Sequence, residues 1–152
     1  MRKVWTFFYG SFMNSDVLAK AEVRPTLRQI ARLDGWELQI APRATLVPAP
    51  GSCVYGVLAQ LTHSDIDKLY TKDWFGFGTY LPEAVIVTDA AARQWAALCY
   101  IAWQTEGGAP TEEYIGKMMV VAREFAFPED YVRHIGSFLQ SGSHRPTETP
   151  AD

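Results

Sequence analysis

The chain has no excess of basic residues. Its 152 residues include 14 lysines and arginines against 17 aspartates and glutamates, for a net charge of −3. Proteins that bind nucleic acid usually gather surplus positive charge on one face, so this balance argues against a nucleic-acid partner. Long apolar runs are missing as well, and none approaches the ~20 residues of a membrane-spanning helix. We therefore expect neither nucleic acid nor a membrane as a partner.

Cysteine is scarce, with only Cys53 and Cys99, which lie far apart in apolar stretches. Two such residues give neither a disulfide framework nor a paired-cysteine zinc motif. The histidines His63, His134 and His144 have no metal-ligand spacing to one another or to a cysteine or carboxylate. We expect buried free thiols and no metal site.

Several familiar sequence signals are also missing. The chain contains no GxSxG, no phosphate-binding GxxxxGK[ST] and no GxGxxG sequence, which removes three common hydrolase and nucleotide-binding motifs. The first apolar run near the N-terminus is about six residues long, against the ~7–15 of a signal peptide. We expect a cytoplasmic protein.

Aromatic residues, by contrast, are plentiful. They make up 13% of the chain, and hydrophobic residues make up 48%, which is enough for one dense core. The length suits one domain. We predict a single domain over residues 1–140, followed by a flexible polar tail over residues 141–152, whose sequence SGSHRPTETPAD is polar and contains prolines.

Hydrophobic periodicity and turn residues indicate an α+β fold. Strands are predicted over residues 4–9, 31–40 (broken at the turn dipeptide Asp34-Gly35), 53–61, 80–88 and 94–103, with a proline-punctuated loop over 42–51. Helices are predicted over residues 16–21, 64–70, 111–125 and from 128 onward. The expected architecture is a curled, mixed but mostly antiparallel, barrel-like sheet with flanking short helices and two C-terminal helices. The helical stripe of Tyr114, Met118, Met119 and Ala122 is expected to be buried.

Two segments could carry chemistry. In residues 9–13, Gly10 directly follows a buried strand and precedes a helix, and such a junction can present backbone N–H groups to an anion or a carbonyl. The alternative is an ordinary strand-to-helix turn. In the second segment, Asp73 stands beside Trp74, Phe75 and Phe77, where desolvation would raise the pKa of the carboxyl towards that of a general base. The alternative there is a solvated loop.

Four sequence blocks resemble one known family. Residues 7–13, with Tyr9-Gly10-Ser11, are similar to the N-terminal signature of the gamma-glutamylcyclotransferase-like family, which includes gamma-glutamylamine cyclotransferases and avirulence-induced proteins. Residues 47–58 resemble its proline-bearing loop and following strand, and residues 62–80 resemble its helix, acidic loop and strand entry. Residues 114–131 resemble its terminal helices, so the likeness covers roughly residues 4–138.

The resemblance implies a fold, a substrate class and a set of site residues. The implied fold is a small curled sheet around a cavity, and the implied reaction cyclises a gamma-glutamyl amine, amino acid or peptide to 5-oxoproline and releases the amine without a cofactor. The implied substrate-binding residues are Tyr9, Gly10, Ser11, Phe12, Met13, Tyr80 and Tyr114. Phe12 stands where the family usually has Asn, so one polar contact is missing.

The family's catalytic glutamate has no unambiguous counterpart here. Counting back from Gly78 and Tyr80 places it at Asp73, which we take as the general base because this alignment keeps a carboxylate. Counting forward from residues 66–69 places it at Tyr70, which is no base at neutral pH. Glu83 is a further acid, but on the predicted strand it shares a face with Leu81 rather than with Tyr80.

Three functional hypotheses follow from these residues. The leading one is a gamma-glutamylcyclotransferase-like enzyme with a small-molecule gamma-glutamyl substrate. The first alternative is a catalytically weak or inactive module of the same fold that binds a small carboxylate-bearing ligand. The second is an interaction protein that uses the aromatic loop over residues 74–77. The sequence leaves a homodimer open.

Overall fold

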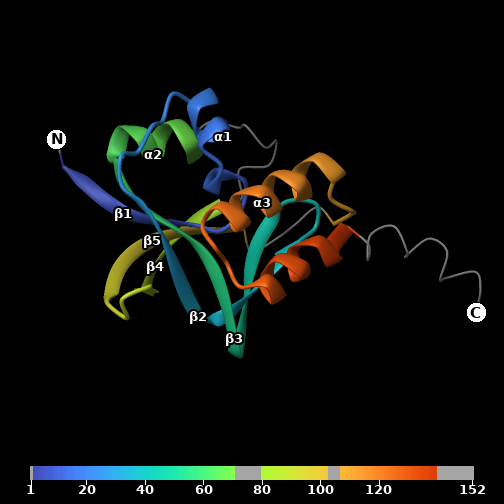
Figure 1. Cartoon of the computed structure of the whole chain (residues 1–152). Helices are drawn as coiled ribbons and strands as arrows, with labels where there is room; N and C mark the ends of the chain where they lie inside the picture. The colour runs from blue at the N-terminus through green and yellow to red at the C-terminus, as the bar shows by residue number, and fades with distance from the viewer. Residues whose placement is uncertain (1, 71–79, 103–106, 140–152) are drawn as a thin grey trace, which may run out of the picture.

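The computed structural model describes residues 2–70, 80–102 and 107–139 (Figure 1). Its strands are β1 (Lys3–Phe8), β2 (Arg28–Ile40), β3 (Ala44–Thr62), β4 (Tyr80–Asp89) and β5 (Gln94–Ala102). Its helices are the 3-10 turn η1 (Ser11–Met13), α1 (Ser15–Lys20), α2 (His63–Tyr70), α3 (Glu112–Glu124) and a further helix over residues 129–139. The predicted α+β class, with two helices after the last strand, is confirmed.

The five strands close into a barrel in the order β1-β3-β2-β4-β5. The pairs β1–β3, β2–β3, β2–β4 and β4–β5 are antiparallel. A parallel contact between Thr6 of β1 and Leu98 of β5 closes the ring. The sheet is therefore mixed but mostly antiparallel, as predicted. Figure 1 shows α1 and α2 over one end of the barrel, with α3 and the helix over residues 129–139 beside it.

The predicted break at Asp34-Gly35 is wrong, because β2 continues through both residues. Gly35 adopts a left-handed conformation with φ +88°, and the register with β3 shifts between Asp34 and Trp36. This is a β-bulge, in which extra residues are accommodated without ending the hydrogen-bonded ladder. The turn-forming dipeptide therefore bends the strand instead of reversing it.

The predicted loop over residues 42–51 is also wrong in most of its length, since β3 begins at Ala44. Pro48 pairs with Trp36 of β2, and the ladder resumes at Cys53 opposite Asp34. In this stretch β2 is the only described strand that pairs with β3. Proline is tolerated at such an edge because the missing N–H leaves no ladder bond unmade on the open side.

Side-chain caps fix where the helices begin. The Asn14 side chain accepts hydrogen bonds from the backbone N–H groups of Asp16 and Val17 and starts α1. Before α2, the N–H of Asp65 donates to the Thr62 hydroxyl (3.0 Å), and the N–H of Thr62 donates to the Asp65 carboxylate (3.1 Å), a reciprocal capping box. Thr111 starts α3 by accepting from the N–H of Tyr114 (3.1 Å). These contacts fix the first turns of α1, α2 and α3.

The inward face of α3 follows the predicted stripe only in part. Met118 and Ala122 are fully buried, as predicted, and Val121 joins them. Met119 and Tyr114 are half-buried instead. Met119 lies against the helix over residues 129–139, where a Cβ on Gly136 would lie 3.4 Å from its sulfur and terminal methyl.

Candidate functional site

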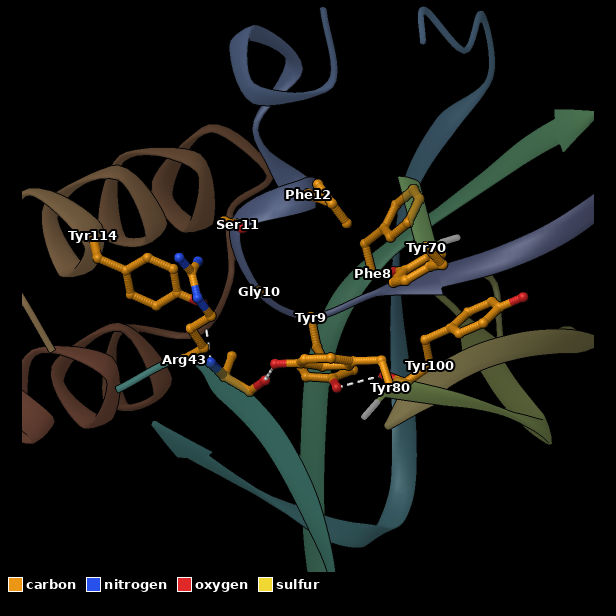
Figure 2. Close-up of a pocket in the computed structure, with 11 residues that line it drawn as sticks. Phe8, Tyr9, Gly10, Ser11, Phe12, Arg43, Tyr70, Tyr80, Tyr100 and Tyr114 are labelled. Atoms are coloured by element: carbon orange, nitrogen blue, oxygen red, sulfur yellow. Dashed lines mark hydrogen bonds between the residues drawn. The ribbon is translucent and has the colours of Figure 1, made fainter. Parts of the chain in front are cut away.

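A pocket opens where the end of β1 meets the β2–β3 hairpin, the end of α2 and the start of α3 (Figure 2). Its cavity volume is about 40 Å³. The lining is mostly aromatic, and seven of its side chains carry a polar group. The lining residues are Phe8, Tyr9, Gly10, Ser11, Phe12, Arg43, Ala44, Tyr70, Tyr80, Tyr100 and Tyr114.

The Gly10–Phe12 wall is formed by a tight turn directly after β1. The N–H of Met13 donates to the carbonyl of Gly10, and the N–H of Asn14 donates to that of Ser11, each over 3.0 Å. Packing at Gly10 is tight, since a Cβ there would lie 3.0 Å from the Cβ of Ala44 and 3.5 Å from the Tyr114 hydroxyl. A larger residue would therefore press against the β2–β3 hairpin.

Two tyrosine hydroxyls hold the backbone of Ala44 from opposite sides. The N–H of Ala44 donates to the Tyr114 hydroxyl of α3 (2.9 Å), and the Tyr80 hydroxyl of β4 donates to the carbonyl of Ala44 (2.6 Å). Ala44 is buried, so these bonds satisfy backbone groups that water cannot reach. Tyr80 and Tyr114 therefore have a structural task at the pocket wall, in addition to any contact with a ligand.

The opposite wall of the pocket is aromatic. The rings of Tyr70 and Tyr100 stack with centroids 3.8 Å apart and planes 7° apart. Phe12 meets Tyr70 edge-on at 5.5 Å and Phe8 at 5.9 Å. The Tyr9 hydroxyl donates to the carbonyl of Tyr100 on the neighbouring strand β5 (2.6 Å). This end of the pocket suits an apolar or planar group.

Burial keeps the pocket's tyrosines neutral. It raises the pKa of Tyr9 and of Tyr70 well above the usual value, and neighbouring titratable groups, Cys99 first, add to both shifts. Burial also raises the pKa of Tyr80 and of Tyr114. Neutral phenols donate hydrogen bonds but do not act as general bases near pH 7.

Arg43 supplies the only full charge among the described lining residues. It is half-buried and comes from the turn between β2 and β3. Its guanidinium opposes the effect of burial on the pKa of Tyr80 and of Tyr114. One end of the pocket is thus cationic and rich in hydroxyls, and Figure 2 shows it across from the aromatic wall.

The structure brings six of the sequence-predicted binding residues to this pocket: Tyr9, Gly10, Ser11, Phe12, Tyr80 and Tyr114. Met13 is fully buried in the core and is not among the lining residues. Asp73 lies outside the described residues. Glu83 is exposed on β4 and borders a separate hollow with Trp36.

Sequence reasoning missed four lining positions outright. Phe8 and Ala44 carry no motif beyond their strands, and Tyr100 is one aromatic in a predicted strand. Arg43 lies in a stretch read as a loop. Tyr70, considered only as the alternative counterpart of the family's acid, lines the pocket. The capping box before α2 was the available signal, because it fixes the helix whose last residue is Tyr70.

Comparison with known proteins gives the family. Residues 53–135 match the model of the AIG2-like family. Gamma-glutamylcyclotransferase of Bos taurus is 22% identical over 143 aligned positions, covering 86% of this chain and 76% of that protein. The chain therefore belongs to the AIG2-like family, and the predicted membership in the gamma-glutamylcyclotransferase-like group is confirmed.

Solved structures share the fold. A gamma-glutamyl cyclotransferase superposes with a TM-score of 0.77 at 19% identity, covering 89% of this chain and 87% of that one. A yeast gamma-glutamyl cyclotransferase specific to glutathione superposes with a TM-score of 0.66 at 13% identity, covering 94% and 96%. At these identities the likeness establishes the architecture only.

Within the described parts of the chain, two further features are absent. No helix there is long and apolar enough to cross a membrane. No group of three or more His, Cys, Asp or Glu side chains is placed to hold a metal ion in those same ranges. Cys99 is buried and Cys53 is half-buried, and both are free thiols.

Proposed function

We propose that this protein is a gamma-glutamylcyclotransferase-type enzyme that binds a gamma-glutamyl compound in the tyrosine-lined pocket and cyclises it to 5-oxoproline. The observation that carries the proposal is the placement of the Tyr9–Phe12 turn. This segment resembles the family signature, and it lines a pocket furnished with phenolic donors. The bovine relative that aligns over most of the chain is named for the same reaction.

The reaction needs little from the protein beyond positioning and proton transfer. The substrate's α-amino nitrogen attacks its own γ-carbonyl carbon, a new C–N bond closes the five-membered lactam, and the bond to the leaving amine breaks. One proton leaves the attacking nitrogen, and one is delivered to the departing amine. Because the attack is intramolecular, holding the substrate folded removes much of the entropic barrier. The Tyr114 hydroxyl, which accepts from the N–H of Ala44 and keeps its own proton to donate, and N–H groups of the turn can stabilise the developing oxyanion.

The proton acceptor in this proposal is Asp73. No carboxylate occurs among the described residues that line the pocket, and its tyrosines are held neutral. Tyr70 and Tyr80, the described residues on either side of the segment that contains Asp73, both line the pocket. Three residues of chain span at most ~11 Å, so the sequence tethers Asp73 within reach of that wall. Aspartate is one methylene shorter than the glutamate expected in the family.

One observation favours a second candidate function, a binding module that keeps the pocket without efficient chemistry. Tyr70 ends α2 and lines the pocket, and one of the two sequence alignments places the family's acid at this residue. Burial raises the pKa of Tyr70, so its phenol cannot replace a carboxylate as a base. In this case the pocket would bind a carboxylate-bearing small molecule and release it unchanged.

A product assay separates the two functions. The protein is incubated with a panel of gamma-glutamyl amines, amino acids and peptides, and 5-oxoproline is measured by mass spectrometry. Asp73→Asn should lose at least the ~10²-fold typical of a general base while still binding 5-oxoproline. Glu83→Gln, which removes the exposed acid of β4, is the matched control and should keep full activity.

Two results would count against the proposal. An Asp73→Asn variant as active as the wild type would remove Asp73 from the mechanism. Ligand binding without 5-oxoproline release across the whole panel, at high protein concentration, would favour the binding module.

A further inference from the structure

The tyrosine hydroxyls of the pocket differ in whether the fold already uses their proton. The Tyr9 hydroxyl donates to the carbonyl of Tyr100, and the Tyr80 hydroxyl donates to the carbonyl of Ala44, each over 2.6 Å. A phenol has one proton, so neither residue can donate to a ligand without breaking a bond within the protein. The Tyr100 hydroxyl points away from the pocket (Figure 2). Donation to a ligand therefore falls to the two remaining tyrosines.

Those two tyrosines are Tyr114 and Tyr70. The Tyr114 hydroxyl accepts from the N–H of Ala44 and keeps its proton. Tyr70 lines the pocket, and no described residue forms a hydrogen bond with its hydroxyl. Burial raises the pKa of Tyr70, and Cys99 in the barrel and Tyr114 across the pocket add to the shift, so the phenol oxygen faces the interior and stays protonated near pH 7.

Ring contacts hold the Tyr70 side chain in one position. Its ring stacks on Tyr100 with centroids 3.8 Å apart and planes 7° apart, and Phe12 meets it edge-on at 5.5 Å. Figure 2 shows Tyr70 beside Phe8 and Tyr100 in the aromatic wall. A donor that is fixed before a ligand arrives loses little further freedom on binding, so its hydrogen bond is worth more to the ligand.

The surroundings of the Tyr70 hydroxyl favour a neutral acceptor. Its neighbours in the wall are the rings of Phe8, Phe12 and Tyr100, and no cationic side chain from the described residues belongs to this wall. A carboxylate placed there would lose its water without gaining an opposite charge. An amide carbonyl loses less on leaving water, and its planar group fits against flat aromatic faces.

We propose that Tyr70 is a specificity-determining residue whose hydroxyl donates a hydrogen bond to an amide carbonyl oxygen of the ligand. The ligand class is therefore a small molecule with a planar amide or lactam. Where the ligand is a gamma-glutamyl compound, which rests on the proposed function, the oxygen bound is that of the γ-carbonyl.

In that reaction Tyr70 also acts as a catalytic residue. When the α-amino nitrogen attacks the γ-carbonyl carbon, the electron pair of the C=O bond moves to the oxygen, which accepts from Tyr70 and Tyr114. The C=O bond of the lactam then re-forms from that pair, the bond to the leaving amine breaks, and the amine takes up a proton. Because the oxygen carries most charge midway, both hydrogen bonds are strongest in the transition state.

The test compares ligands with and without a carbonyl acceptor in the ring. Titration calorimetry measures the affinity of the protein for 5-oxoproline and for cyclopentanecarboxylate, which has the same ring size and carboxylate but no lactam. The variant is Tyr70→Phe, which removes the hydroxyl and keeps the stacked ring. Because no described residue bonds to this hydroxyl, Tyr70→Phe should unfold at the same urea concentration as the wild type.

A matched control comes from β3. Tyr55 is half-buried, lies outside the lining of the pocket, and packs against Tyr131 and Phe127 with ring centroids 5.3 and 5.8 Å away. Tyr55→Phe makes the same chemical change as Tyr70→Phe, so any general effect of losing a phenol appears in both variants.

A hydrogen bond between neutral groups is worth roughly two- to tenfold in affinity. The wild type should bind 5-oxoproline more tightly than cyclopentanecarboxylate by at least about twofold. Tyr70→Phe should weaken 5-oxoproline by about two- to tenfold and leave cyclopentanecarboxylate unchanged, and Tyr55→Phe should behave as the wild type. In the 5-oxoproline release assay, Tyr70→Phe should lower kcat by about 10²-fold with little change in KM, as expected for the loss of one oxyanion donor.

Three results would overturn the proposal: no binding of 5-oxoproline by the wild type, no preference of the wild type for 5-oxoproline over cyclopentanecarboxylate, or an equal change for both ligands in Tyr70→Phe. The comparison in the wild type needs no variant, so it stands even if Tyr70→Phe does not fold. Tyr70-dependent binding of 5-oxoproline, without its release from any gamma-glutamyl compound, would support the role of Tyr70 and refute the proposed function. Release of 5-oxoproline by Tyr70→Phe at the wild-type rate would refute the catalytic role of Tyr70 and leave the proposed function standing.

Discussion

Replacing Tyr114 with phenylalanine removes one hydroxyl and leaves the ring in place. That hydroxyl accepts the N–H of Ala44 over 2.9 Å, and Ala44 is only 3% exposed. In Tyr114→Phe the N–H loses its partner and remains out of reach of water, which costs about 1–3 kcal/mol. We expect the free energy of unfolding to fall by about 2 kcal/mol, equivalent to a Tm lower by ~4–8 °C for a chain of this size.

Urea unfolding followed by circular dichroism measures this loss, with the midpoint and slope giving the free energy. Tyr100→Phe is the matched control, because Figure 2 shows the Tyr100 hydroxyl pointing away from the pocket. That variant should lie within ~0.5 kcal/mol of the wild type, as surface substitutions usually do. If Tyr114→Phe and Tyr100→Phe unfold at the same urea concentration, the bond between α3 and the hairpin is not a stabilising contact and the reasoning fails.

Two further predictions concern packing and pH. At Gly56 of β3 an added Cβ would lie 2.3 Å from the carbonyl oxygen of Phe8, so Gly56→Ala should destabilise the fold by about 3 kcal/mol in urea unfolding. Gly116→Ala, in α3 with open space around it, should instead stabilise the fold by up to ~1 kcal/mol, and equal effects would contradict the packing described here. Burial raises the pKa of Tyr9 and of Tyr80, so the folded chain retains protons that the unfolded chain releases above pH ~10. The free energy of unfolding should therefore fall as the pH rises from 10 to 11, whereas a flat profile over that range would mean that these phenols are solvated.

Local side-chain chemistry accounts for the parts of the fold that the sequence predicted well. The predicted helices over residues 16–21 and 111–125 exist because Asn14 and Thr111 cap them, and a side-chain oxygen that accepts from nearby backbone N–H groups works without help from distant residues. The strand predicted over residues 80–88 likewise rested on its consecutive β-branched residues Val85, Ile86 and Val87. Each of these signals is contained in a few neighbouring residues.

The errors came where tertiary pairing overrides local preference. Asp34-Gly35 and Pro48 are turn-forming residues, yet they lie inside one long hairpin because Trp36 pairs with Pro48 and Asp34 pairs with Cys53. A bulge of this kind depends on the length of both strands, which no short window reveals. The strands β2 and β3 were therefore predicted too short.

The residues of the candidate site also fall into two groups, those that local sequence signals reveal and those that only the tertiary structure brings together. The Tyr9–Phe12 turn could be found because its residues are contiguous and follow a buried strand. Arg43 and Tyr100 could not, since closure of the barrel brings together β5 and the β2–β3 turn, which are more than fifty residues apart in the chain. In the sequence, a single arginine next to a proline predicts only an exposed loop, and its place at a cavity becomes visible only in the folded structure.

The two bonds to Ala44 also affect how this pocket can evolve. Tyr80 and Tyr114 line the cavity and at the same time join β4 and α3 to the hairpin, so natural selection acts on the stability of the chain and on its ligand through the same two hydroxyls. Tyr70, by contrast, meets Phe12 and Tyr100 through its ring alone. Substitutions that change the ligand are therefore best tolerated along the aromatic wall, because they leave the hydrogen bonds that join β4 and α3 to the hairpin in place. Relatives with different preferences should differ there first and keep the two hydroxyls longest.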